Sequence, residues 1–173
     1  VKELVEYFQE KCHEEWVKEL EAEGQGAEGS GGLRTAEKLA LALELRLKKQ
    51  ADYMSTWPQA LALQALPQNA PASIANLART CDSAWNFAGE HASPSDLRWY
   101  SKRMTLGGIY MATELYMLTD YSPDFVDTFD FLRRQLQEVD KAGSTAGFAM
   151  SQVQGLMEQA LSQIQNSKDR NRP

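Results

Sequence analysis

The chain has little of what secreted, nucleic-acid-binding and membrane-spanning proteins require. Its two cysteines, Cys12 and Cys81, are too few for a disulfide scaffold and favour a reducing intracellular compartment. A net charge of −6, from 18 basic and 24 acidic residues, argues against electrostatic capture of nucleic acid. No apolar run approaches the roughly 18 residues that a membrane span needs. With 173 residues, 43% of them hydrophobic, the chain fits one domain with its own core.

Residues for catalysis and cofactor binding are also scarce. The two histidines, His13 and His91, fall in different segments, which leaves a serine- or cysteine-type triad little to draw on. Glu10 and His13 form a lone Glu-x-x-His, whereas a di-iron bundle needs two such pairs and two further glutamates. Residues 24–29 spell Gly-x-Gly-x-x-Gly but follow a helical pattern, where a dinucleotide site needs a strand. We therefore expect no enzyme activity, no cofactor and no metal site.

Apolar residues recur at helical spacing along the chain, and no segment argues well for a strand. We expect an all-α bundle of about seven helices. The helices are predicted over residues 1–22, 35–55, 57–66, 74–88, 95–118, 122–143 and 144–166. Alternating leucines in residues 35–55 would suit a strand, but the Ala, Glu, Arg and Lys around them are helix formers. Ser122, Pro123 and Asp124 mark a helix start as N-cap, first-turn proline and first-turn acid.

The predicted helices divide the chain into five parts. These are an N-terminal helix (1–22), a Gly-rich linker (23–34), a helical core (35–143), a C-terminal amphipathic helix (144–166) and a polar tail (167–173). Within the core, Gly107 and Gly108 fall in the middle of a predicted helix, where glycine lowers helix stability. The pair indicates a neighbouring helix packed closely against this position.

One helical stripe has the composition of a protein-binding surface. Asp96, Trp99, Tyr100 and Arg103 follow the spacing i, i+3, i+4 and i+7, which places them on one side of a helix. Trp, Tyr and Arg are the residues enriched in binding hot spots. We predict that this stripe points away from the core and binds a partner protein. The alternative is that Trp99 is buried against the loop at 89–95, which would leave only a capped helix start.

The last predicted helix is strongly amphipathic, with its apolar residues in one arc of roughly 140°. The bland interpretation is packing on the core or on a second copy of the chain, as a homodimer. The sharper one is a helix that lies on a membrane or holds a lipid, although its polar face is mostly Gln and attracts anionic lipid weakly. The residues assigned to membrane contact are Phe148, which lies on the polar side, and Met150, Val153, Leu156, Met157, Leu161 and Ile164.

Methionine and aromatic residues on the other apolar faces have two interpretations, which stay open at this point. They pack in the core, or they form the wall of an elongated cavity, where such side chains adapt to a flexible ligand. The residues assigned to lipid binding are Met54, Trp57, Leu61, Leu77, Trp85, Met104, Met111, Leu115 and Phe129.

Four blocks of the sequence resemble one known family. They are Thr-Trp-Pro-Gln-Ala-Leu with Ala-Leu-Pro-Gln-Asn (56–69), Trp-Tyr-Ser-Lys-Arg with Ile-Tyr-Met-Ala-Thr-Glu-Leu (99–115), Ser-Pro-Asp-Phe-Val-Asp-Thr-Phe with Phe-Leu (122–132) and Val-Gln-Gly-Leu-Met (153–157). In order and spacing they resemble the ubiquinone-biosynthesis accessory lipid-binding proteins, the ninth of the coenzyme Q assembly proteins. The resemblance runs from about residue 35 to 165, and residues 1–22 fit more loosely.

The resemblance implies the ligand-binding part of a TetR-like fold and a location on the matrix side of the mitochondrial inner membrane. It implies an isoprenoid lipid or phospholipid in a central cavity, and a di-iron hydroxylase of the ubiquinone pathway as partner. The hydroxylase patch of the family maps onto Asp96, Trp99, Tyr100 and Arg103, and its membrane helix onto 144–166. The helix-turn-helix of TetR-type regulators would precede residue 1, so we expect no DNA binding.

The function expected from these observations is non-catalytic. The chain would take polyprenylated intermediates from the membrane and present them to the hydroxylase. The alternatives are a small-molecule-binding domain of a TetR-type transcription regulator, and a structural dimerisation domain without a ligand.

Overall fold

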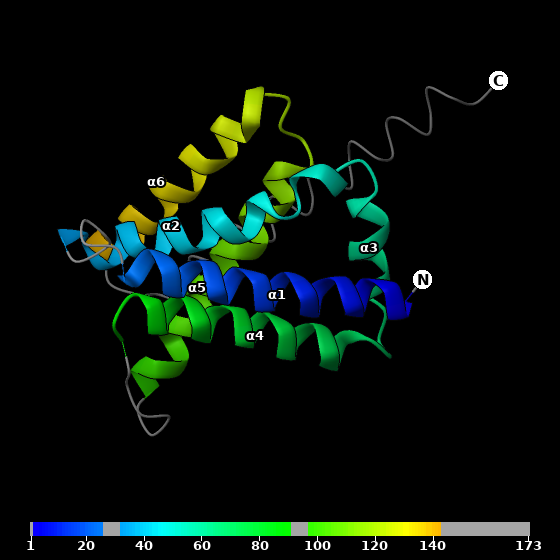
Figure 1. The fold of residues 1–173 in the computed structure, drawn as a ribbon, viewed down its shortest axis with the longest axis horizontal. Coiled ribbons are helices and arrows are strands. Elements are labelled where there is room, and N and C mark those ends of the chain that lie inside the picture. The colour runs from blue at the N-terminus through cyan, green and yellow to red at the C-terminus, as the bar shows by residue number, and fades with distance from the viewer. Residues whose placement is uncertain (1, 26–31, 91–96, 143–173) are drawn as a thin grey trace.

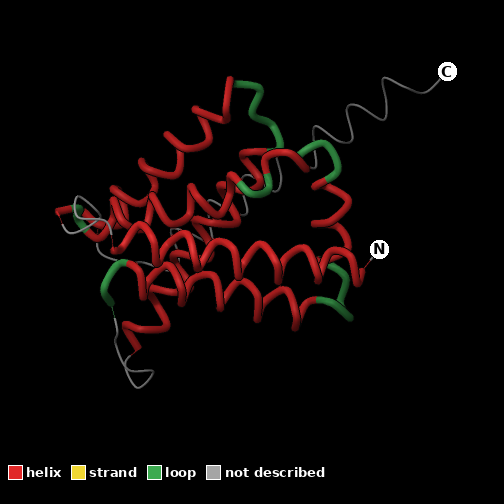
Figure 2. Tube along the Cα trace, viewed as in Figure 1, coloured by secondary structure: helices red, strands yellow, loops and turns green. Residues whose placement is uncertain are grey.

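A computed structural model of the chain describes residues 2–25, 32–90 and 97–142. These residues form α-helices joined by short turns, and none of them is in a strand (Figure 2). The helices are α1 (Lys2–Gln25), α2 (Thr35–Lys48), α3 (Trp57–Gln64), α4 (Ala70–Phe87), α5 (Leu97–Met117) and α6 (Val126–Ala142), with the 3-10 turns η2 (Ala51–Tyr53) and η3 (Pro123–Phe125). The all-α prediction is confirmed. About seven helices were expected; the described ranges contain six α-helices, and the predicted helix 144–166 lies outside the described residues.

Helix α2 lies at the centre of the bundle and packs against α1, α4 and α6. In Figure 1, α1 runs between α2 and α4, and α3 stands at the N-terminal end of α1. The alternating leucines of α2 are explained by burial on several sides, because Leu39, Leu43 and Leu47 are buried together with three alanines. Trp16 on α1 is fully buried, and its indole Nε1 donates to the carbonyl of Ala42 at 2.8 Å. The indole therefore fixes α1 to the central helix.

Gly107, the first glycine of the pair in α5, meets α4, as the sequence predicts for this position. A β-carbon placed at Gly107 would lie 3.4 Å from the Leu77 side chain and 3.5 Å from the Cys81 sulfur. This is ordinary contact distance, so α4 and α5 approach closely along this line without room for a larger side chain.

The prediction of one helix over residues 35–55 is wrong at its C-terminal end. Helix α2 ends at Lys48, and the chain continues through the 3-10 turn η2. Gln50 lies between them, fully buried, and its Nε2 donates to the Tyr110 hydroxyl at 2.8 Å. The contact with α5 holds the chain in a turn at Gln50, where local helix propensity alone would continue the helix.

Two helix starts also differ from the prediction. Helix α4 begins at Ala70 rather than near residue 74, with Pro71 in its first turn, where the missing N–H of proline costs little. Helix α6 begins at Val126, after η3, rather than at the Ser-Pro-Asp sequence itself. Asp124 and Phe125, the last two residues of η3, adopt left-handed backbone angles, with φ of 53° and 57°. The chain therefore does not continue from η3 into α6 as one regular helix.

Candidate functional site

A cavity of about 240 Å³ lies where α1, α2, α3, α4 and α5 come together. Its apolar wall comes from α3, α4, α5 and the turn after α3, and consists of Leu61, Ala65, Ile74, Leu77, Met111 and Leu115. The volume is just below the range of about 300–1,000 Å³ typical of small-molecule sites. Ile74 is 67% exposed and Met111 is also exposed, so the cavity reaches the surface between α4 and α5. An apolar ligand has a way in at this rim.

Polar side chains from α1, α2 and α5 form the buried end of the same cavity. Gln9, Arg46, Tyr110 and Glu114 line it, and all four are buried. Arg46 Nη2 donates to Gln9 Oε1 at 2.7 Å. Trp57 Nε1 donates to Glu114 Oε1 at 2.9 Å from outside the cavity. The site is therefore amphipathic, with buried hydrogen-bonding groups at one end and an exposed rim at Ile74 and Met111. Further polar lining comes from α3 and α4, namely Gln64, Ser73, Asn76 and Thr80.

Burial controls the protonation of this end. It raises the pKa of Glu114 above its usual value, and the Trp57 hydrogen bond and the Arg46 charge oppose the effect without cancelling it. Burial also raises the pKa of Tyr110 well above its usual range, so its hydroxyl stays protonated near neutral pH. The closed end therefore offers the neutral Tyr110 hydroxyl beside the buried Arg46 guanidinium.

Four of the residues predicted to bind lipid meet in this cavity. Leu61, Leu77, Met111 and Leu115 come from three different helices and line the same apolar wall. Their spacing along the chain gave no direct indication that they would meet, because contacts between helices are not local. The structure thus brings together part of the predicted set.

The other five predicted lipid residues lie elsewhere. Trp57, Trp85 and Phe129 are buried, and Trp85 and Phe129 belong to the main hydrophobic core. Met54 packs half-buried against that core. Met104 is 61% exposed, on the outer surface of α5. Trp57 and Trp85 also line other cavities, of about 550 and 280 Å³, so the core and cavity-wall interpretations both stay open for them.

The polar end of the cavity was not predicted from the sequence. A signal was present, because Arg46 falls between Leu43 and Leu47 on the leucine-rich face of α2, and Glu114 lies in an otherwise weakly polar stretch of α5. A charged residue inside an apolar stripe marks either a buried polar cluster or an error in the predicted face.

The predicted partner stripe is only partly exposed, and its binding role stays a prediction. Trp99 and Tyr100 lie together at the start of α5, with ring centroids 4.8 Å apart, and Tyr100 is exposed. Arg103 does not point away from the bundle as predicted. Its guanidinium stacks 3.7 Å from the centre of the Trp99 ring and pairs with Asp82 on α4. The fourth residue, Asp96, lies outside the described residues.

Other candidate chemistry finds little support in the described ranges. His13 is partly buried, and burial lowers its pKa to about 4; its Nε2 lies 3.5 Å from the Ser83 hydroxyl. Within residues 2–25, 32–90 and 97–142, no group of three or more His, Cys, Asp or Glu is placed to hold a metal ion. None of the helices in these ranges is long and apolar enough to cross a bilayer. The predicted membrane contact, from Phe148 to Ile164, lies outside the described residues.

The family model and the curated relatives that match this chain carry the same family name. The family model described as COQ9 matches residues 70–143, which contain α4, α5 and α6. The ubiquinone biosynthesis protein COQ9 of Xenopus tropicalis is 37% identical over 169 residues, which cover 92% of this chain and 51% of the relative. The human COQ9 protein is 36% identical over 165 residues, which cover 92% of this chain and 51% of the human protein. The probable ubiquinone biosynthesis protein coq9 of Dictyostelium discoideum is 34% identical over 140 residues, which cover 80% of this chain and 45% of that relative.

The chain spans about half the length of the curated relatives it matches. All three are named as mitochondrial proteins, which supports the mitochondrial localisation predicted from the resemblance. The segment that the family model matches carries Leu77, Met111 and Glu114 of the cavity, and also Trp99 and Tyr100. On these matches, the chain belongs to the COQ9 family of ubiquinone biosynthesis proteins.

Proposed function

We propose that this protein is a non-catalytic lipid carrier of ubiquinone biosynthesis, which takes a polyprenylated intermediate from the membrane and presents it to a di-iron hydroxylase. The relatives are named as ubiquinone biosynthesis proteins, and the intermediates of that pathway join a polar ring to a long apolar tail. The single observation that carries the proposal is the amphipathic cavity, with an apolar wall, an open rim at Ile74 and Met111, and a polar closed end.

The cavity volume limits how the lipid is held. Burial of each CH₂ group is favourable by about 0.8 kcal/mol, so a carrier competes with the bilayer only if it covers the tail. A cavity of about 240 Å³ accepts the ring and the first part of the tail. The remainder would lie along the apolar rim at Ile74 and Met111 and against a further cover, for which we propose residues 144–166. Membrane contact and a homodimer are two roles proposed for the same segment.

A cavity-filling substitution tests lipid binding. Leu61→Trp places a large ring in the apolar wall, so we expect the prenylated lipid recovered by solvent extraction and mass spectrometry to fall about fivefold or more. Steric crowding of this kind costs about 1–3 kcal/mol, which corresponds to that change in affinity. Ala62→Trp is the matched control, because Ala62 is the next residue of α3 and is exposed. If the unaltered protein yields no lipid at all, the structural dimer with a filled core is the better account.

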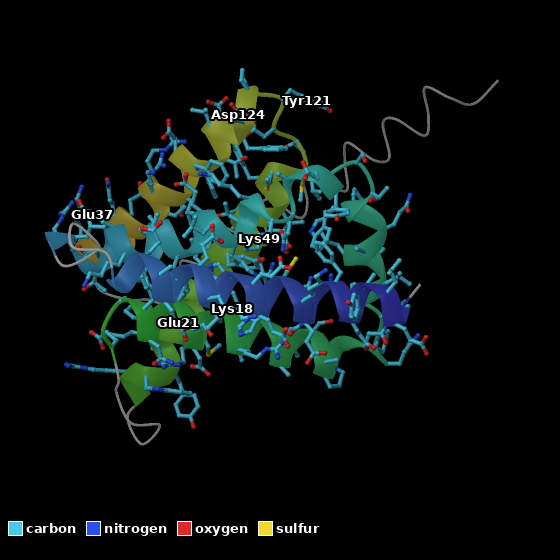
Figure 3. All side chains as sticks on the ribbon, in the orientation of Figure 1. Lys18, Glu21, Glu37, Lys49, Tyr121 and Asp124 are labelled. Carbon is cyan, nitrogen blue, oxygen red and sulfur yellow. The ribbon has the colours of Figure 1, made fainter. Side chains whose placement is uncertain are left out.

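The surface at the start of α5 is proposed to bind the hydroxylase. Trp99→Ala is expected to weaken that binding about tenfold, measured by calorimetry, with a melting temperature within about 2 °C of the unaltered protein. Tyr121→Ala is the control, since Tyr121 is 96% exposed and lies beyond the opposite end of α5, where Figure 3 shows it projecting from the bundle. A fall of many degrees in melting temperature would instead make Trp99 a structural residue that holds Arg103.

A further inference from the structure

Arg46 carries a positive charge at a position that is only 2% exposed. It lies on α2 between the fully buried Leu43 and Leu47. Its Nη2 donates to Gln9, while its Nε and Nη1 have no hydrogen-bond partner among the described residues. A guanidinium has five N–H groups, so the one on Nε and the two on Nη1 are unused. Buried donors without acceptors are rare in folded proteins, and each needs an explanation.

Nearby side chains balance this charge only in part. Among the described residues, Arg46 forms no ion pair within salt-bridge distance. Its charge opposes the burial that raises the pKa of Glu114, and its charge and a side-chain hydrogen bond oppose the same effect on the pKa of the Cys12 thiol, so both groups lie close to it. The Glu114 side chain is already an acceptor for Trp57. Neither group is a strong acceptor still open to the Nε and Nη1 donors of Arg46.

Arg46 lines the cavity, and the exposed apolar residues Ile74 and Met111 line the same cavity at its mouth. An amphiphile that enters through this mouth would bring its polar head to the buried guanidinium. A cavity of about 240 Å³ accepts one ring and the first part of its tail more readily than a diacyl phosphate head with the start of two chains. A ring oxygen, either carbonyl or phenolate, would accept a hydrogen bond from an unpartnered N–H group of Arg46.

We propose that Arg46 is the head-group anchor of this site: the ligand enters ring first, and an oxygen on its quinone or phenol ring accepts a hydrogen bond from an unpartnered N–H group of Arg46, on Nε or on Nη1. The assignment rests on the proposed lipid-binding function and adds to it a specificity-determining residue. It explains why a charge is kept where an apolar residue of similar size would pack at least as well. Arg46 selects ligands by their head, and the apolar wall binds the tail.

The test compares two probes on the full chain. The first is a ubiquinone with two isoprene units, and the second is a prenyl hydrocarbon of the same chain length without a ring. Binding is followed by quenching of tryptophan fluorescence for the quinone, and by competition for the hydrocarbon. Arg46→Met is expected to weaken quinone binding about tenfold or more and to leave hydrocarbon binding within about twofold. Arg134→Met is the control, because Arg134 is exposed on α6, and both affinities should stay within about twofold.

Several results would overturn the anchor. If Arg46→Met and the unaltered protein bind the quinone equally well, Arg46 is not the anchor, although the proposed lipid binding is unaffected. An equal loss for both probes makes Arg46 structural. If Arg46→Met loses affinity for a fatty acid probe, oleate, but not for the quinone, Arg46 binds carboxylates rather than ring oxygens. If the unaltered protein binds neither prenyl probe, the proposed function itself fails, and the anchor with it.

A second variant guards against a folding defect. Arg46→Lys keeps the charge and the long side chain but loses the planar pair of donors. We expect an intermediate loss of quinone affinity, of about three- to tenfold, with hydrocarbon binding unchanged. Unchanged quinone affinity in a folded Arg46→Lys protein would show that charge alone, rather than directed hydrogen bonding, accounts for recognition, and would overturn the anchor as stated.

Discussion

Replacing Trp57 by alanine is expected to lower the free energy of unfolding by about 3–5 kcal/mol, the usual cost of removing a fully packed aromatic side chain. Trp57 is only 3% exposed, at the first position of α3. Its ring lies edge-on to Phe8 of α1, with centroids 5.7 Å apart, and its Nε1 donates to Glu114 of α5. One side chain thus joins three helices, and its truncation leaves both a cavity and a buried carboxyl group without its donor.

Trp57→Phe separates these two effects. Phenylalanine keeps most of the buried apolar surface but has no N–H, so we expect a smaller loss of about 1–3 kcal/mol, from the unpaired Glu114. Urea unfolding at pH 7, followed by circular dichroism, measures both variants. If Trp57→Ala unfolds within about 1 kcal/mol of the unaltered protein while lipid recovery collapses, then Trp57 is a residue of a cavity wall, one of the two interpretations that the sequence leaves open.

The role of Trp57 matters for the site because α3 carries Leu61 into the cavity, and the turn after it carries Ala65. Helix α3 has only eight residues, too few to be stable alone. Its position therefore depends on tertiary contacts, of which the Trp57–Glu114 hydrogen bond is one. A protein that loses this bond is expected to lose part of the cavity wall as well.

Helical periodicity predicted the fold class and most helices, since it reports which side of a segment is apolar. Leu39, Leu43 and Leu47 are buried as that pattern requires, and Gly107 meets α4. The ends of the helices were harder to predict from the sequence. The end of α2 depends on Gln50 reaching Tyr110, a residue 60 positions later, and a contact between such distant residues leaves no local pattern.

The residues of the candidate site also differ in whether a local sequence pattern marks them. Four apolar wall residues were predicted because each lies on an apolar helix face, which is a local property. The polar end was not predicted, because Arg46 and Glu114 acquire their meaning only when α1, α2 and α5 meet. Arg103 was placed on the correct stripe, but its partner Asp82 lies on another helix, and the ion pair turns the guanidinium inward. Pairing across helices, rather than the helices themselves, is what sequence reasoning lacked.

Removal of the Asp120 carboxylate is expected to have the second-largest effect on stability, a loss of about 2–3 kcal/mol for Asp120→Ala at pH 7. The carboxylate accepts from the backbone N–H of Ser122 at 2.7 Å, and from the backbone N–H and hydroxyl of Thr128 at 2.9 and 2.5 Å. Thr128 is fully buried, so its donors have no access to water when the carboxylate is gone. Asp120, rather than the predicted Ser122, therefore supplies most of the hydrogen bonding at the start of α6.

The same carboxylate gives a pH dependence whose direction is determined by its pKa. Burial alone would raise the pKa of Asp120, but the hydrogen bonds from Thr128 and Ser122 outweigh burial and hold it below its usual value. A lowered pKa means that the contribution is present above about pH 4 and is lost as the pH falls through the folded-state value. The difference in unfolding free energy between the unaltered protein and Asp120→Ala should thus be largest near pH 7 and shrink toward about pH 2.5.

Urea unfolding at a series of pH values measures this difference. Asp127→Ala is the control on the same turn of α6, because Asp127 is exposed and its charge acts only through the helix dipole, worth about 0.3–1 kcal/mol. A difference for Asp120→Ala that stays constant from about pH 7 to pH 2.5 would contradict the assignment, because the ionised form could not then be what the Thr128 donors bind. A difference that shrinks as stated ties the stability of α6, and of the family-matched segment that ends with it, to one carboxylate.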